Sequence, residues 1–141
     1  MKFSKSNLIA LCNVVAVFFG VLYSNLFAQS FPAGFSQVQL CTGVNNPTCM
    51  AFANDGRIFI GKKNGEIVIF KNGALNALPF ASISTSSSGE RGLLGMALDP
   101  DFDNNHYVYI YYTLSSGIKN RIARITANGD YMVPGSEVLI L

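Results

Sequence analysis

The 141-residue sequence lacks a cluster of basic side chains, and only 13% of its residues are charged. Two of its ten lysines and arginines, Lys2 and Lys5, stand in an apolar N-terminal segment. The other eight are matched by eight acidic residues and are scattered along the chain. Binding to the phosphates of nucleic acid requires a clustered basic face. The composition therefore argues against nucleic acid as a partner.

The sequence also lacks any CxxC pair or cysteine–histidine spacing, so it indicates no zinc site. Of its three cysteines, Cys12 lies in the apolar N-terminal segment. Cys41 and Cys49 remain as an even pair, separated by TGVNNPT. In an oxidising compartment such a pair favours a disulfide. Two buried free thiols are the alternative.

Residues 1–28 have the layout of a secretory signal peptide. Two lysines come first, an apolar run from Leu8 to Tyr23 follows, and cleavage after Ala28 would leave Gln29 as the N-terminus. An uncleaved membrane anchor is the alternative, although a comfortable span takes ~20 apolar residues and this run is shorter. We therefore expect a signal peptide over 1–28, a folded part over 29–141, and a secreted or periplasmic location.

The folded part predicts short antiparallel strands joined by tight turns. Asn, Asp and Gly tolerate the positive φ angles of such turns, and they gather at 54–56, 63–65 and 72–73. Apolar and alternating segments between these turns predict strands over 48–53, 57–61 and 66–71. A short outer strand is expected within 74–80. Together these segments form one unit of an antiparallel meander.

The same unit recurs roughly fifty residues later. MAFANDGRIFIG (50–61) parallels MALDPDFDNNHYVYIYY (96–112), and KNGEIVIFKNG (63–73) parallels KNRIARITANG (119–129). Periods of roughly 40 to 50 residues with several strands per repeat are typical of β-propellers. The sequence therefore predicts an all-β fold, a β-propeller with about two blades in this chain. Residues 137–141 are expected to close the second blade or to begin a third.

Two blades do not close a propeller, because a ring takes ~4 to 8 of them. We therefore expect the chain to be the N-terminal part of a longer protein. A small independent β domain and a self-assembling half-propeller are the alternatives.

Several segments together resemble the N-terminal portion of the soluble glucose/sorbosone dehydrogenases that depend on pyrroloquinoline quinone (PQQ). They are PAGFSQ, NPTCMAFANDGRIFIGKKNGEIVIFKNG, GERGLLGMALDPDFDNNHYVYIYYT, NRIARIT and PGSEVLIL. The resemblance implies a six-bladed β-propeller with PQQ and calcium near its axis. It also implies oxidation of a sugar or polyol, with a histidine as general base and a downstream electron acceptor. Related propellers, such as those of Hedgehog-interacting proteins, imply no such oxidation.

The resemblance carries over to one active-site position. In sugar-oxidising members a glutamine just before the GLLG run lines the substrate pocket, and Glu90 holds that place here. A carboxylate keeps the hydrogen-bond acceptor, loses the donor and adds a charge that Arg91 could balance. Glu90 and Arg91 are therefore the predicted substrate-binding residues. A structural salt bridge at the rim is the alternative, although adjacent strand residues point to opposite faces.

No catalytic, cofactor-binding or metal-binding residue of the family is expected in this chain. The resemblance places the catalytic histidine and the ligands of PQQ and calcium in later blades, and His106 does not match that histidine. The alternating Asp99, Asp101 and Asp103 look like the start of a calcium loop, but Asn104 stands where that loop needs glycine. An Asp-Pro turn with side-chain-to-backbone hydrogen bonds is the better explanation.

Three tyrosines alternate along the strand predicted after this turn, at positions 107, 109 and 111. A strip on which sugars stack is one interpretation, and a strand packed between two blades is the favoured one. For the complete protein we expect an exported quinoprotein sugar dehydrogenase, with the present chain inactive alone. A non-catalytic secreted propeller that binds a glycan or a protein is the alternative.

Overall fold

The computed structural model describes residues 31–141, so the predicted signal peptide lies outside the described residues. The chain divides into two units, Met1–Val38 and Gln39–Leu141. Residues 31–38 of the first unit contain no strand or helix, and one turn is closed by a 3.0 Å hydrogen bond from the Phe35 amide to the Pro32 carbonyl.

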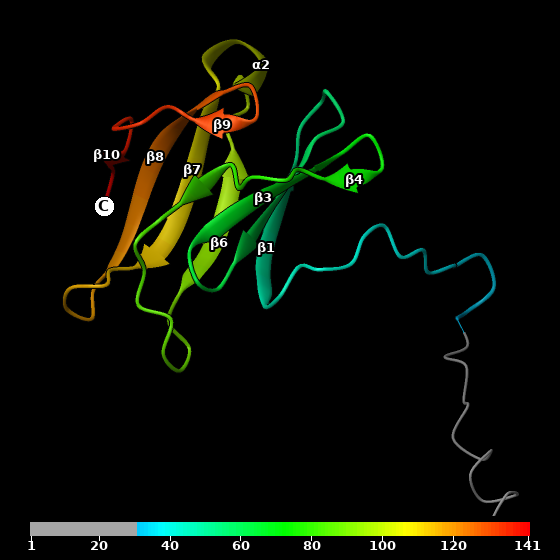
Figure 1. Ribbon diagram of the computed structural model, residues 1–141, viewed down its shortest axis with the longest axis horizontal. Helices are drawn as coiled ribbons and strands as arrows, with labels where there is room; N and C mark the ends of the chain where they lie inside the picture. Colours follow the sequence, from blue (N-terminus) through cyan, green and yellow to red (C-terminus); the bar gives the residue numbers. More distant parts are fainter. Residues whose placement is uncertain (1–30) are drawn as a thin grey trace, which may run out of the picture. The chain divides into compact units, whose positions relative to one another are not determined.

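The second unit consists of two antiparallel sheets, which we call blade 1 and blade 2 (Figure 1). Blade 1 has the order β1-β2-β3-β4, and β5 also pairs with β3. Its strands are β1 (Pro47–Phe52), β2 (Ile58–Lys62), β3 (Glu66–Lys71), β4 (Ala74–Leu75) and β5 (Ala81–Ser82). The three predicted strands and the turns between them are thus confirmed to within two residues.

Blade 2 repeats this arrangement with the order β10-β8-β7-β6, and β9 pairs with β8. Its strands are β6 (Leu93–Leu98), β7 (Tyr107–Thr113), β8 (Asn120–Asn128), β9 (Tyr131–Met132) and β10 (Val138–Leu139). The all-β fold with two propeller blades, predicted from the internal repeat, is confirmed. Because β10 pairs with β8, residues 138–139 close blade 2.

Two local predictions were incomplete. The segment 74–80 was expected to form one outer strand, but β4 and β5 pair with β3 separately. Pro79 stands between them and has no N–H to donate, which interrupts the ladder. The second difference is the short helix α2 (Phe102–Asn105), which lies in the segment expected to be a turn.

A shared core between the blades holds them together. Phe59, Ile67 and Ile69 of blade 1 and Leu93, Val108 and Ile125 of blade 2 are completely buried. The Phe59 ring meets the rings of Phe80 and Phe102 edge to face, with centroids 5.1 and 5.8 Å apart. Burying such side chains stabilises each by roughly 1.5–3 kcal/mol.

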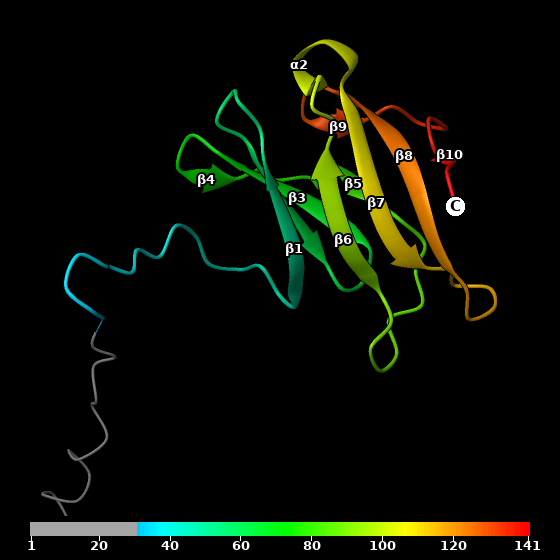
Figure 2. The ribbon, with the colours of Figure 1, turned by 180° about the vertical axis from the view of Figure 1, so that it is seen from behind.

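The inner strands of the two blades, β1 and β6, lie side by side in both ribbon views (Figures 1 and 2). The Thr48 hydroxyl joins them, because its Oγ1 lies 2.6 Å from the Leu93 carbonyl oxygen and 3.2 Å from that of Gly61. This bond fixes the start of β6 against blade 1.

The strand directions give the two-blade body two ends. At one end lie the turns β1–β2, β3–β4, β6–β7 and β8–β9, and we call it the Asp55 end. At the other lie the turns β2–β3 and β7–β8 and the connection from blade 1 to blade 2, and we call it the Glu90 end. In Figure 1 helix α2 marks the first end and the long green loop marks the second.

Candidate functional site

The predicted substrate residues lie in the connection between the blades, residues 84–92, which we call the Glu90 loop. Both ends of this loop are fixed to the β2–β3 turn of blade 1. The Ile83 amide donates to the Gly65 carbonyl at 2.9 Å, and the Leu93 amide donates to the Lys63 carbonyl at 3.2 Å. One turn of blade 1 therefore sets where the loop leaves blade 1 and where it enters blade 2.

Two glycines permit this close contact. Gly65 has φ +95°, and a Cβ there would lie 2.0 Å from the Ile83 carbonyl oxygen. Gly92 has φ +148°, and a Cβ there would lie 2.5 Å from the Lys63 carbonyl oxygen. A side chain at either position would collide with backbone, and L-residues rarely adopt these φ angles. The glycines of KNG and of ERG thus share one structural role.

Further hydrogen bonds hold the body of the Glu90 loop from both sides. From blade 1, the Lys63 Nζ donates to the Gly89 carbonyl. From blade 2, the Ser86 amide donates to the Thr113 carbonyl at 3.0 Å, and the hydroxyls of Ser84 and Ser115 lie 2.9 Å apart. The loop is therefore braced between the blades at the Glu90 end.

Glu90 itself is exposed and Arg91 is half-buried. The Arg91 side chain turns back on its own loop, where its Nε lies 2.9 Å from the Ser88 carbonyl oxygen. Among residues 31–141 no ion pair joins Glu90 to Arg91. The rim salt bridge is thus not formed, and substrate contact by the two residues stays a prediction. An exposed carboxylate on a braced loop is chemically a hydrogen-bond acceptor.

Cys41 and Cys49 are both free and half-buried, so the structure has the second of the two alternatives drawn from the sequence. Strand alternation turns Cys49 toward the core, where its Sγ lies 2.6 Å from the position that a Cβ on Gly61 would take. Burial raises the pKa of the Cys49 thiol, and hydrogen bonds from Thr48 and Gly61 lower it to a smaller extent.

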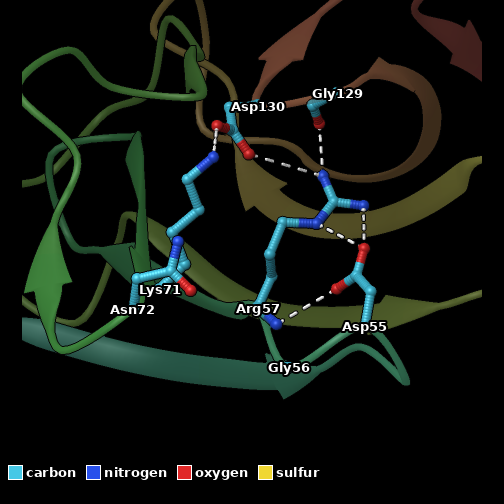
Figure 3. A pocket seen from close by; sticks show the side chains of 7 residues that line it. All are labelled: Asp55, Gly56, Arg57, Lys71, Asn72, Gly129 and Asp130. Carbon is cyan, nitrogen blue, oxygen red and sulfur yellow. Dashed lines mark hydrogen bonds and ion pairs between the residues drawn. The ribbon is translucent and has the colours of Figure 1, made fainter.

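A second cluster, absent from the sequence analysis, lies at the Asp55 end and joins the blades through charge (Figure 3). The Arg57 Nη2 lies 2.7 Å from the Asp55 carboxylate, and the Arg57 Nη1 lies 3.8 Å from the Asp130 carboxylate. Lys71 also pairs with Asp130. The Arg57 side chain is 13% exposed and stacks over the Phe59 ring with its Cζ 5.2 Å from the centroid. A cation of blade 1 thus contacts an anion of blade 2.

These contacts lower the pKa of both carboxyl groups. For Asp130 the main cause is the hydrogen bond from Lys71, and for Asp55 it is the hydrogen bond from Arg57. The cluster lines a hollow of about 450 Å³. Because two cations face two anions there, the charges compensate one another, and we interpret the cluster as a contact between blades. Equivalent turns in the two repeats carry these charges, which is the signal that sequence could have offered.

The acidic turn after β6 is held by its own side chains. The Asp99 carboxylate accepts hydrogen bonds from the Asp101 amide and the Asn105 side chain, both at 2.9 Å, and from the Tyr109 hydroxyl at 2.8 Å. These bonds lower the pKa of Asp99, the Asp101 amide first among them. The turn with side-chain-to-backbone bonds, favoured from the sequence, is confirmed.

His106 ends helix α2 in a left-handed conformation, φ +58°, with its Nδ1 3.0 Å from the Phe102 carbonyl oxygen. It belongs to the Asp55 end and is therefore remote from Glu90. Its role in the described structure is to terminate the helix.

The described residues do not fit a PQQ–calcium site. PQQ carries carboxylates that call for uncommitted basic groups, whereas Arg57, Lys62 and Lys71 pair with acidic side chains of the same chain. Arg124 stacks on Tyr107 with its Cζ 4.0 Å from the ring centroid. Within residues 31–141, no three His, Cys, Asp or Glu side chains gather to hold a metal ion. No chemical step is therefore assigned to this cofactor here.

Two repeated blades with a braced connecting loop define a β-propeller protein, and comparison with known proteins gives its family. The sequence profile of the Glucose / Sorbosone dehydrogenase family matches residues 44–140. The chain belongs to this family.

Similar structures include two sugar dehydrogenases. The chain is 35% identical, with a TM-score of 0.66, to an oxidoreductase of the glucose dehydrogenase type from Thermus thermophilus, over 72% of this chain and 31% of that one. It is 30% identical, with a TM-score of 0.60, to the PQQ-bound aldose sugar dehydrogenase from Streptomyces coelicolor, over the same shares of each chain.

Curated relatives include quinoprotein glucose dehydrogenase B from Acinetobacter calcoaceticus, 28% identical over 64% of this chain and 20% of that protein. An uncharacterised Synechocystis protein is 32% identical over 66% of this chain and 25% of its own length. The chain thus spans a quarter or less of the curated relatives it matches. Among residues 31–141, no helix is long and apolar enough to cross a membrane.

Proposed function

We propose that the chain supplies two adjacent blades of an exported quinoprotein that oxidises an aldose or polyol, and that the Glu90 loop contacts the sugar. The observation that carries the proposal is the placement of Glu90, exposed on a loop that both blades brace, within the segment that matches the family. A sugar presents hydroxyl donors, and a fixed carboxylate accepts from them without first losing loop entropy.

In this proposal the residues of the chain bind and orient, and the redox chemistry belongs to groups beyond them. PQQ, when bound, would accept the hydride from the sugar carbon, as the quinoprotein relatives suggest. Glu90 would fix one hydroxyl of the sugar, and Arg91 would hold the loop conformation through Ser88. Lys63 would keep the loop at a constant height above blade 1.

A chimera tests this function. Residues 44–140 would replace the matched segment of the Streptomyces coelicolor aldose sugar dehydrogenase, and aldose-dependent reduction of a dye would be measured with PQQ and calcium added. We expect activity that requires both the sugar and PQQ. A chimera that folds and binds PQQ but oxidises no aldose or polyol would contradict the proposal, and PQQ absorbance and heat unfolding distinguish that result from misfolding.

The second candidate is a secreted propeller that binds a glycan or a protein without oxidising it. The observation in its favour is that Glu90 cannot donate to a sugar oxygen as the family's glutamine can. Binding of an aldose by the chimera without turnover would favour this candidate. The secreted or periplasmic location stays a proposal, and N-terminal sequencing of the exported protein tests cleavage before Gln29.

A further inference from the structure

The two blades present apolar surface on the faces that do not meet each other. On blade 1 the outward face of β1, β2 and β3 includes Met50 and Phe52, which are 59% and 67% exposed. Register places on that same face Met50, Phe52, Ile58, Ile60, Val68 and Phe70. We call this set face 1.

Blade 2 has an outward face of its own. Tyr111 is 38% exposed there. Register places on this face Gly95, Ala97, Tyr109, Tyr111, Ile122 and Arg124, which we call face 2. A hollow of about 210 Å³ lies on it, lined in part by Gly95, Ala97 and Tyr111.

The internal repeat shows that face 1 corresponds to the surface of blade 2 that packs on blade 1. In blade 1, Met50 pairs with Ile60, and Phe52 pairs with Ile58. In blade 2 the same register positions are Met96 with Ile110 and Leu98 with Val108. Ile110 and Val108 are 1% and 0% exposed, since they pack in the shared core. Face 1 is therefore the uncovered counterpart of a surface that is covered in the other repeat.

Face 2 corresponds in the same way to the surface of blade 1 that receives blade 2. Ala51 pairs with Phe59 in blade 1, and Ala97 pairs with Tyr109 in blade 2. Phe59 is completely buried in the contact between the blades. The two uncovered faces of the molecule are thus the two halves of an interface that already forms once inside it.

We propose that face 1 of one copy of this chain docks on face 2 of a second copy, and that copies joined in this way close into a ring. The contact is heterologous, because it joins different surfaces of the two copies, and such contacts form rings when the rotation closes. The rotation between blades is the one that β-propellers close after ~4 to 8 blades.

The comparisons suggest how many copies complete the ring. The matched part of the chain makes up 31% of the Thermus thermophilus structure, which is close to one third. Three copies would therefore supply about as many blades as that single chain contains. We expect a trimer that leaves no uncovered blade face.

Light scattering after size exclusion tests the assembly with the full chain and two variants. Phe52→Asp places a charge on face 1 only, and Tyr111→Asp places one on face 2 only. The wild-type chain is expected at three times the mass of one chain, and each variant alone is expected as a monomer. Ile118→Asp, which changes a 78% exposed side chain in the β7–β8 turn, is the control and is expected to remain a trimer.

Mixing the two variants gives the sharpest result. The Phe52 variant retains face 2 and the Tyr111 variant retains face 1, so an equimolar mixture is expected to form a one-to-one dimer that stops there. Circular dichroism of each variant shows that it is folded. A wild-type monomer over the whole dilution series, an open polymer, or a folded pair of variants that stay apart when mixed would each overturn the proposal.

Discussion

The Nζ of Lys63 in blade 1 donates a hydrogen bond to the carbonyl oxygen of Gly89, the residue before Glu90. The carbonyl of the same lysine accepts from the Leu93 amide at 3.2 Å, where β6 begins. One residue of the first blade thus contacts both the predicted substrate loop and the strand that follows it. The position of Glu90 consequently depends on the packing of two blades.

Removing the Lys63 ammonium should loosen the Glu90 loop with little loss of stability. Lys63→Met deletes one exposed hydrogen bond, which contributes about 0.5–1.5 kcal/mol. We expect faster amide exchange within residues 84–92 and unchanged exchange in β2 and β3. Lys62→Met is the matched control, because the Lys62 ammonium pairs with Glu66 within its own blade. Equal exchange of the loop in the wild type and the Lys63 variant would show that the lysine is dispensable.

A methyl group at position 92 should destabilise the chain. Gly92→Ala would force a Cβ to 2.5 Å from the Lys63 carbonyl oxygen at φ +148°, so the start of β6 must move. We expect a loss of about 1–3 kcal/mol in the free energy of unfolding by urea.

Gly89→Ala is the control for this strain. Gly89 also has a positive φ, +58°, but a Cβ there has nothing within 4 Å. Its loss should stay near the ~1 kcal/mol of an ordinary left-handed residue. Equal losses in the two variants would contradict the close packing of Gly92 on blade 1.

The Asp130 cluster should make stability depend on pH in the acidic range. The pKa of Asp130 is lower in the folded chain, mainly through Lys71, so its contribution is present above the unfolded value of ~3.9 and is lost as pH falls through the folded value. Asp130→Asn removes the pairs with Arg57 and Lys71 and should cost about 1 kcal/mol at neutral pH.

The same variant should lose less stability than the wild type on acidification. Asp55, Glu66 and Asp99, whose pKa values are also lowered, keep part of the dependence. Urea unfolding at neutral pH and near pH 3 measures the difference. Asp101→Asn is the control, because no ion pair in the described part of the chain involves Asp101. A wild-type pH dependence in the Asp130 variant would show that the cluster contributes nothing.

The chain alone should not bind PQQ. Its basic side chains Arg57, Lys62 and Lys71 are paired internally, so a carboxylate ligand must break existing ion pairs to use them. Titration calorimetry of the full chain with PQQ and calcium is expected to give no heat of binding. Saturable one-to-one binding would contradict this assignment of the cofactor to other blades.

Much of the fold could be predicted because local and repeated signals agree. The turn at Asn54-Asp55-Gly56 and the alternation in 66–71 specify neighbouring strands, and the second copy of the repeat, which begins with MAL where the first has MAF, specifies the second blade. The split between β4 and β5 was not predictable, since it depends on where two short segments meet β3. Helix α2 was also missed, because a single helical turn has no periodicity.

The site was predicted less completely, for a physical reason. Glu90 could be proposed from its place before GLLG, but Lys63 lies 26 residues before Gly89 in the chain, and their contact forms only when the blades pack. The link from Arg57 to Asp130 likewise spans two repeats. Such contacts between blades have no signature in the local sequence of either partner.

The most direct test of the account is the preference among aldoses of the sugar dehydrogenase chimera that carries residues 44–140, compared between Glu90 and Glu90→Gln. Because glutamine adds a donor and removes a charge, KM ratios between aldoses should shift about 10-fold or more, while heat unfolding and PQQ binding stay the same. Glu66→Gln, a carboxylate change at the same end of the blades, should leave the ratios unchanged. Identical KM ratios in the wild-type and Glu90→Gln chimeras would contradict contact between the Glu90 loop and the sugar.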